Sequence, residues 1–262
     1  MTERKHEGII VALVNNKGGV AKTTTAVALA AALADEGKRT LLVDLDAQGS
    51  AGLSLGLTRA DLSPGTAEVL LDRHPVRSAI RPTAVEGLDI LPAGMTLTSA
   101  DLVLADVAGR ETVLKTALDP VRRDFDFIVL DCPPALGLLV VNALIAADCF
   151  LIPVTPDYLA LEGLVNLMDA VDRIRAGIGG EAVMLGILLT MMDHRLNVTE
   201  EIGRMIRRHY GRAVFKTEVP INVKLKEAPS FGRTIFDFAG GSTGAAAYRA
   251  LTREVLHRIR SL

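Results

Sequence analysis

The feature that most constrains this chain is a loop of glycines and lysines between an apolar run and an alanine-rich run. Residues 9–14 are continuously apolar and are predicted to form a buried strand. Residues 22–36 have the composition of a helix, and Gly37 follows them as a typical C-terminal stop signal. A strand, a short loop and a helix in this order begin a β–α–β unit. The sequence therefore predicts a parallel sheet with right-handed crossovers.

The same alternation continues along the chain. Further strands are predicted at residues 40–43, 88–91, 127–130, 149–153 and 183–190. Further helices are predicted at residues 138–146, 161–174, 198–209 and 242–259. The 262 residues include no Trp, and no linker divides them. We expect a short polar tail at residues 1–8, followed by one α/β domain at residues 9–262. Its mostly parallel, twisted sheet should be covered by helices on both faces.

Composition excludes several classes of protein. The formal net charge is −2, so attraction to nucleic acid or to a membrane requires a local patch rather than the field of the whole chain. The two cysteines, Cys132 and Cys149, form neither a metal-ligand cluster nor a disulfide framework. This usage favours a reducing, cytoplasmic setting.

No segment has the composition of a signal peptide or of a transmembrane span. Residues 1–8 are polar and lack the apolar stretch of a signal peptide. The long apolar run at residues 136–154 is interrupted by Asn142 and Asp148 and ends near Pro153. Because a membrane span tolerates such residues poorly, we expect a buried helix followed by a buried strand, and no membrane association.

The loop itself has the composition of a phosphate-binding cradle. Gly18 and Gly19 lack Cβ atoms and allow the backbone to approach a polyphosphate, while the next helix presents its N-terminus to the anion. Lys22 can place its charge near the terminal phosphates, and Thr23 can offer a hydroxyl to Mg²⁺. The residues of this segment predicted to contact ATP are Lys17, Gly18, Gly19, Val20, Ala21, Lys22, Thr23 and Thr24. A glycine-rich turn with incidental lysines is the alternative, and the strand–loop–helix context opposes it.

Acidic residues at the ends of two predicted strands are candidates for a Mg²⁺ site. Asp44 and Asp46 end the strand at residues 40–43, with the alternation that would point both to one side. Asp131 ends the apolar strand at residues 127–130. Carboxylates at the C-terminal ends of parallel strands lie where ligands bind, and Mg²⁺ prefers oxygen ligands. The alternative is that these side chains only cap loops.

The loop resembles the deviant Walker A motif of the ParA/MinD family of P-loop proteins, in which an additional lysine precedes the glycines. Ala21 departs from the glycine more common there; alanine is tolerable if this position is helical and costly if it requires a positive φ. Four other blocks are similar to ParA proteins of the Soj-like branch: residues 43–49, 131–137, 160–163 and 219–232. In the first of these blocks Ala47 replaces the usual proline.

The resemblance implies a slow, Mg²⁺-dependent ATPase that forms a homodimer with ATP between the subunits. Lys17 would reach the partner's phosphates and, with Lys22, stabilise charge during phosphoryl transfer. Asp46 would position the attacking water and would, with Thr23 and Asp131, serve the Mg²⁺ site, partly through water. Pro220 and Asn222 match the loop that holds adenine. The alternative for Lys17 is a solvated loop lysine.

The resemblance also implies binding of the dimer to double-stranded DNA without sequence preference. Arg195, Lys224, Lys226 and Arg233 match basic positions of the family's DNA-facing surface. A ParB-type protein would stimulate hydrolysis and release the DNA, in a cytoplasmic, nucleoid-associated system for chromosome or plasmid partition. An ordinary solvated basic face is the alternative for each of the four residues.

Three other functions compete with partitioning. A MinD-like membrane switch would use residues 248–262 as an amphipathic lipid-binding helix, although packing against the core explains the same spacing. A reductase like the nitrogenase iron protein would require cysteines that bridge a cluster, which Cys132 and Cys149 do not match. A scaffold that binds nucleotide without hydrolysis remains open because of Ala21, although Lys22 and Asp131 oppose it.

Overall fold

The computed structural model describes residues 7–261, which form one α/β domain around an eight-stranded sheet. The order of the strands is β3-β4-β2-β5-β1-β6-β7-β8, and all pairs are parallel except β3 with β4. The strands are β1 (Ile9–Leu13), β2 (Thr40–Asp44), β3 (Arg81–Pro82), β4 (Leu88–Leu91), β5 (Phe127–Asp131), β6 (Cys149–Val154), β7 (Val183–Met192) and β8 (Val214–Pro220). Residues 1–6 of the predicted tail lie outside the described residues.

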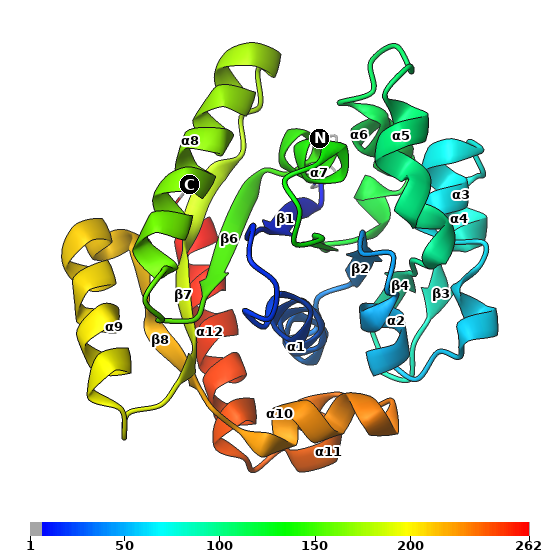
Figure 1. The fold of residues 1–262 in the computed structure, drawn as a ribbon. Helices are drawn as coiled ribbons and strands as arrows, with labels where there is room; N and C mark the ends of the chain where they lie inside the picture. The colour runs from blue at the N-terminus through cyan, green and yellow to red at the C-terminus, as the bar shows by residue number, and fades with distance from the viewer. Residues whose placement is uncertain (1–6, 262) are drawn as a thin grey trace, which may run out of the picture.

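Helices cover both faces of the sheet, as predicted (Figure 1). The longer helices are α1 (Lys22–Asp35), α7 (Leu138–Ala146), α8 (Ala160–Ile178), α9 (Asn197–Tyr210) and α12 (Thr243–Ile259). The shorter helices are α2 (Ser50–Ser54), α3 (Thr66–Leu71), α4 (Val76–Ala79), α5 (Ala100–Leu104), α6 (Val113–Leu118), α10 (Val223–Glu227) and α11 (Ile235–Ala239). One core lies between the sheet and the layer of α1 and α12, and the other lies under α3 to α9.

Helix α1 packs closely on the centre of the sheet because its buried side is made of small residues. All six of its alanines are buried, which lets the helix backbone approach β1 and β5. The hydroxyls of Thr25 and Tyr248 form a buried hydrogen bond of 3.0 Å that joins α1 to α12. This packing fixes the start of α1, and therefore the loop before it, against the carboxyl end of β1.

All the predicted strands are present to within one or two residues, and the apolar run at residues 136–154 forms α7 and β6. The prediction missed β8, a seven-residue strand in which Lys216, Thr217 and Glu218 interrupt the apolar pattern. Short helices between β2 and β5 were also missed, because four to six residues give too little periodicity to recognise. Within residues 7–261, no helix is both long enough and apolar enough to span a membrane.

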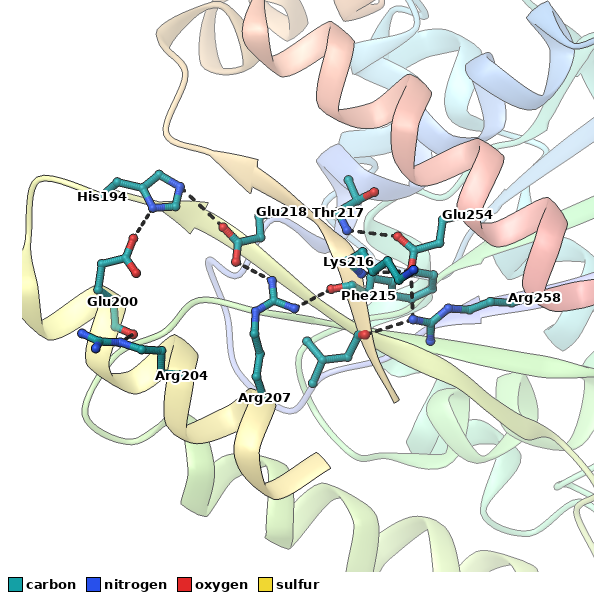
Figure 2. Close-up of polar contacts among 11 residues, drawn as sticks. His194, Glu200, Arg204, Arg207, Phe215, Lys216, Thr217, Glu218, Glu254 and Arg258 are labelled. Atoms are coloured by element: carbon teal, nitrogen blue, oxygen red, sulfur yellow. Dashed lines mark hydrogen bonds and ion pairs between the residues drawn. The ribbon is translucent and has the colours of Figure 1, made fainter. Parts of the chain in front are cut away.

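Both edge strands of the described sheet have features that protect an edge. β3 has two residues and ends at Pro82, which has no N–H to donate. On β8, the exposed Lys216 and the terminal Pro220 interrupt the edge. Glu254 of α12 accepts hydrogen bonds from the backbone N–H groups of Lys216 and Thr217, at 2.9 and 3.0 Å (Figure 2).

Candidate functional site

The predicted phosphate loop follows β1 and opens outward. Gly19 has a φ of 74°, which glycine adopts without strain, and a Cβ atom added at Gly18 or Gly19 would meet nothing within 4 Å. Asn15 fixes the base of the loop: its Oδ1 accepts from Lys17 N at 2.9 Å, and its Nδ2 donates to Pro153 O at 2.7 Å. The loop therefore has the open space and the anchoring that a polyphosphate cradle requires.

Ala21 occupies the position at which a positive φ is required. Its backbone is left-handed, with φ 62° and ψ 32°, and it is the N-cap residue of α1. The sequence left open whether this position is helical or left-handed, and the structure shows the strained alternative. The chain accepts the strain because β1 and α1 hold both ends of the loop.

Lys22 lies beneath the loop rather than in solvent. The residue is 7% exposed, and its Nζ donates to Lys17 O at 2.8 Å. Burial lowers its pKa, while the nearby charge of Asp131 opposes that shift. The ammonium group therefore lies between the loop backbone and a carboxylate, in the place the motif predicts.

Asp131 is completely buried at the end of β5. Neither of its carboxylate oxygens receives a hydrogen bond of ordinary geometry from residues 7–261, although the Thr23 hydroxyl is close enough to lower its pKa. Burial outweighs that effect and raises the pKa. A buried carboxylate without a partner is costly in a folded chain, and beside Thr23 and Lys22 it fits a Mg²⁺ site.

Asp44 and Asp46 have different environments. β2 ends at Asp44, so the strand alternation expected to place both side chains on one side stops before Asp46, which lies in the following loop. The buried Asp44 carboxylate accepts from Asp46 N at 3.0 Å and Ala51 N at 3.1 Å, and burial raises its pKa, with the charge of Asp131 adding to the shift. Asp46 is partly exposed and accepts from Gln48 N at 3.0 Å. Asp44 thus organises the loop that holds Asp46.

The second lysine of the motif, Lys17, lies on the surface of the loop. Its side chain is 45% exposed, and its Nζ forms an ion pair with Asp157, which follows β6. The neighbouring Tyr158 is 91% exposed and Leu159 is 54% exposed. The lysine and this exposed apolar surface lie together at the rim of the cradle.

The predicted adenine-binding residues lie at the end of β8. Asn222 is the N-cap of α10: its Oδ1 accepts from Lys224 N at 2.8 Å, and its Nδ2 donates to Thr243 Oγ1 at 2.8 Å. Pro220 is the last residue of β8 and is partly exposed. Adenine binding by this loop remains a prediction.

The four basic residues predicted to contact DNA are exposed and follow the carboxyl ends of β7 and β8. Arg195 is 84% exposed and makes a bidentate pair with Asp193, at 2.8 and 2.7 Å. Lys224 pairs with Glu227 at 2.7 Å, one guanidinium nitrogen of Arg233 donates to Asp237 O, and Lys226 is exposed on α10.

The basic segment that ends at Arg233 touches the turn after α2 through two glycines. Gly56 and Gly232 have φ values of 91° and 61°, and a Cβ atom on Gly232 would lie 2.7 Å from the Gly56 Cα. Sequence reasoning did not identify this contact, nor the roles of Asn15 and Asp157. Their partners are distant in the sequence, so only the positive φ of the glycines could have been expected from residue type.

The strand order, the phosphate loop and the buried Asp131 define a P-loop nucleotide-binding domain. The protein-family model described as an AAA domain matches residues 8–181. The chain is 43% identical to the chromosome partitioning protein ParA of Myxococcus xanthus, over 96% of this chain and 89% of the relative. It is 44% identical to the chromosome-partitioning ATPase Soj of Thermus thermophilus, over 95% of this chain and 96% of the relative. The chain belongs to the ParA/Soj family of chromosome-partitioning ATPases.

A solved structure with a similar fold is known with nucleotide. Cobyrinic acid a,c-diamide synthase from Mycobacterium smegmatis, bound to an ATP analogue and magnesium, superposes with a TM-score of 0.84 and is 33% identical. The match covers 97% of this chain and 96% of that one. The fold of the present chain is therefore one in which a related protein binds nucleotide and Mg²⁺.

Proposed function

We propose that this chain is a Mg²⁺-dependent ATPase of DNA segregation whose ATP-bound dimer binds DNA without sequence preference. The observation that carries the proposal is the completely buried Asp131, without a hydrogen bond of ordinary geometry, beside Lys22 and Thr23 under an open glycine loop. A buried carboxylate whose oxygens receive no hydrogen bond of ordinary geometry is explained by a cation that the site is built to receive.

The residues around the cradle have distinct roles in this proposal. Thr23 and Asp131 would hold Mg²⁺, with Asp46 acting partly through water, and the ion would neutralise charge on the phosphate oxygens. Lys22 binds the terminal phosphates, because its ammonium group already lies beneath the loop. Asp46 orients the attacking water, since it is the partly exposed member of the acidic group.

Dimerisation would complete the site. Lys17 lies at the rim of the cradle beside the exposed Tyr158, so a second subunit facing this surface would bring each lysine towards its partner's nucleotide. A cation that enters from the other subunit stabilises charge that develops during phosphoryl transfer. The Lys17–Asp157 ion pair must open for this to happen.

DNA binding would depend on the dimer because each subunit offers only a few basic side chains. Arg195, Lys224, Lys226 and Arg233 are exposed, and two copies of this set would double the number of phosphate contacts. A ParB-type partner that stimulates hydrolysis would then release the DNA by separating the subunits. This part of the proposal rests on the family to which the chain belongs.

The alternative of a MinD-like membrane switch receives less support. It requires that the apolar side of the C-terminal helix be free to enter lipid. In α12, Tyr248, Leu251 and Val255 are completely buried against the sheet. A helix packed in this way is part of the core.

The experiment that tests the proposal is a DNA-binding titration with a non-hydrolysable ATP analogue, with ADP and without nucleotide, over a series of salt concentrations. We expect binding only with the ATP analogue, falling with salt as phosphate contacts require. Lys17→Ala should abolish it while nucleotide binding persists, and Asp131→Asn should abolish Mg²⁺-dependent hydrolysis. DNA binding that ignores nucleotide, or no DNA binding in any condition, would refute the proposal.

A further inference from the structure

The end of β7 is hydrogen-bonded directly to the phosphate loop. The Thr190 hydroxyl donates to Val20 O at 3.1 Å, and both residues are buried, at 0% and 2% exposure. This contact joins positions 170 residues apart. Because both residues are buried, water cannot replace either partner of this hydrogen bond. A movement of the Val20 carbonyl therefore either moves the Thr190 hydroxyl or leaves both groups without a partner.

A strained residue follows each end of this hydrogen bond. Ala21, the residue after Val20, has a φ of 62°, and Met191, the residue after Thr190, has a φ of 51°. Left-handed backbone at residues other than glycine is unfavourable and persists only where the surroundings impose it. The phosphate loop and the end of β7 therefore meet beside two strained residues, one on each segment.

Beyond Met191, the chain leads directly to the predicted DNA-facing segments. Met192 O accepts from Ile221 N at 3.0 Å, and Ile221 immediately precedes the N-cap of the helix that carries Lys224. On the other side, Asp193 holds the Arg195 guanidinium through two hydrogen bonds. Both basic segments are thus attached to the last residues of β7.

The loop that carries Arg195 is also tied to the elements on either side of it. His194 lies between Glu200 of α9 and Glu218 of β8, with an Nε2–Oε2 distance of 3.5 Å to Glu218 (Figure 2). Glu218 in turn pairs with Arg207 of α9. The loop that continues directly from β7 is thus also held by side chains of α9 and β8.

We infer that Thr190 is a positioning residue that couples occupancy of the phosphate loop to the arrangement of the DNA-facing segments within one subunit. The inference rests on the proposed function and goes beyond it. In the proposed function, DNA affinity depends on ATP only through dimerisation, whereas this coupling acts within one subunit. Phosphate binding shifts the Val20 carbonyl, Thr190 follows it, and the Arg195 loop and the start of α10 move with β7. By linkage, DNA must then favour ATP binding by the same factor.

The test compares Thr190→Val with Thr190→Ser and with a matched control, Thr252→Val. Thr252 is also buried and also donates its hydroxyl to a backbone carbonyl, that of Tyr248, but it lies within α12. For each protein, the DNA dissociation constant is measured without nucleotide and with a saturating ATP analogue, and the dimer fraction is recorded by sedimentation. Because the ATP analogue is saturating, a variant with weaker nucleotide affinity is still fully occupied, so such a loss does not affect the comparison.

In the unaltered protein we expect the ATP analogue to tighten DNA binding by more than the dimer fraction explains, within the usual range of about 5- to 150-fold for coupled sites. Thr190→Val should lose this additional factor at an unchanged dimer fraction, and Thr190→Ser should restore it. Thr252→Val should keep it. The inference is overturned if the ATP analogue tightens DNA binding by Thr190→Val as much as by the unaltered protein, or if Thr252→Val loses the additional tightening to the same extent as Thr190→Val. Either result leaves the proposed function standing.

A measurement on the unaltered chain tests the inference even where a Thr190 variant fails to fold. Amide exchange at residues 193–196 is followed with and without the ATP analogue, at a concentration where sedimentation shows only monomer. A nucleotide-dependent change in protection supports coupling within one subunit, and identical exchange overturns it. If the unaltered protein shows no effect of nucleotide on DNA binding, the proposed function fails together with this inference.

Discussion

Replacing Ala21 with glycine is expected to stabilise the chain, although glycine ordinarily weakens a folded protein. Ala21 is held at φ 62° and ψ 32° at the N-cap of α1. For a residue with a Cβ atom, this conformation costs about 1–2 kcal/mol, because the Cβ approaches the carbonyl oxygen. Glycine has no Cβ atom and adopts this conformation without that cost, and it is also a better N-cap than alanine.

The gain is reduced by the unfolded state. Glycine makes the unfolded chain more flexible, which removes about 0.4–1 kcal/mol of stability. The difference lies between about 0 and 1.6 kcal/mol, and its central value of about 0.8 kcal/mol corresponds to a rise of roughly 2–3 °C in the unfolding midpoint of a domain of this size. Nucleotide affinity should be unchanged, because glycine can keep the same backbone conformation.

Urea unfolding without nucleotide provides the measurement, with stabilisation read from the midpoint at a constant m-value. The matched control is Ala246→Gly, at an exposed position inside α12, where the same replacement should destabilise by about 1 kcal/mol. A loss of stability in Ala21→Gly comparable with that of the control would refute the strain at Ala21.

Three further results are expected. Asp157→Ala removes the partner of Lys17, so ATP-dependent dimerisation should tighten by up to about fivefold, the value of a surface ion pair; an unchanged dimer affinity in sedimentation would contradict this. His194 has a raised pKa, chiefly because a neighbouring glutamate accepts its hydrogen bond, so the charged form that holds its loop is lost as pH rises above the ordinary value of 6.5. Amide exchange of that loop should therefore accelerate beyond the intrinsic rate as pH rises from 6.5 through the raised pKa, and a His194→Gln variant that accelerates equally would refute the role of the imidazole. Gly232→Ala should destabilise by about 2 kcal/mol, because its φ is 61° and its Cβ would meet the Gly56 Cα; an unchanged thermal midpoint would exclude that close contact.

Features set by neighbouring residues could be predicted from the sequence. The phosphate loop depends on glycines and lysines at fixed spacing, and the strand before it is a continuous apolar run, so residues 9–36 were assigned correctly. The burial of Asp131 also follows from its position at the end of the central strand β5, whereas Lys22 is the first residue of α1, directly after the loop. The strand β8 was missed because it lies at the edge of the sheet, where a strand need not be apolar throughout, and three consecutive polar residues interrupt its apolar pattern.

Features set by distant contacts could not be predicted. The ion pair between Lys17 and Asp157 spans 140 positions, and the hydrogen bond between Val20 and Thr190 spans 170. No local pattern marks Asp157 as the acceptor or Thr190 as the donor, since an aspartate or a threonine near a strand end most often bonds within its own loop. The φ of Ala21 was undetermined for a related reason: it depends on how β1 and α1 are placed, and residue type alone favours the opposite value.

The protected edges of the sheet limit how copies of this chain can assemble. Strand addition requires an open row of backbone donors and acceptors, and at β8 Glu254 already occupies two of the donors while β3 stops after two residues. If the chain polymerises along DNA, the filament must be joined through loops and helix surfaces rather than through a continuous sheet. Such a filament could be taken apart one subunit at a time without breaking backbone hydrogen bonds between subunits, unlike a cross-β fibre.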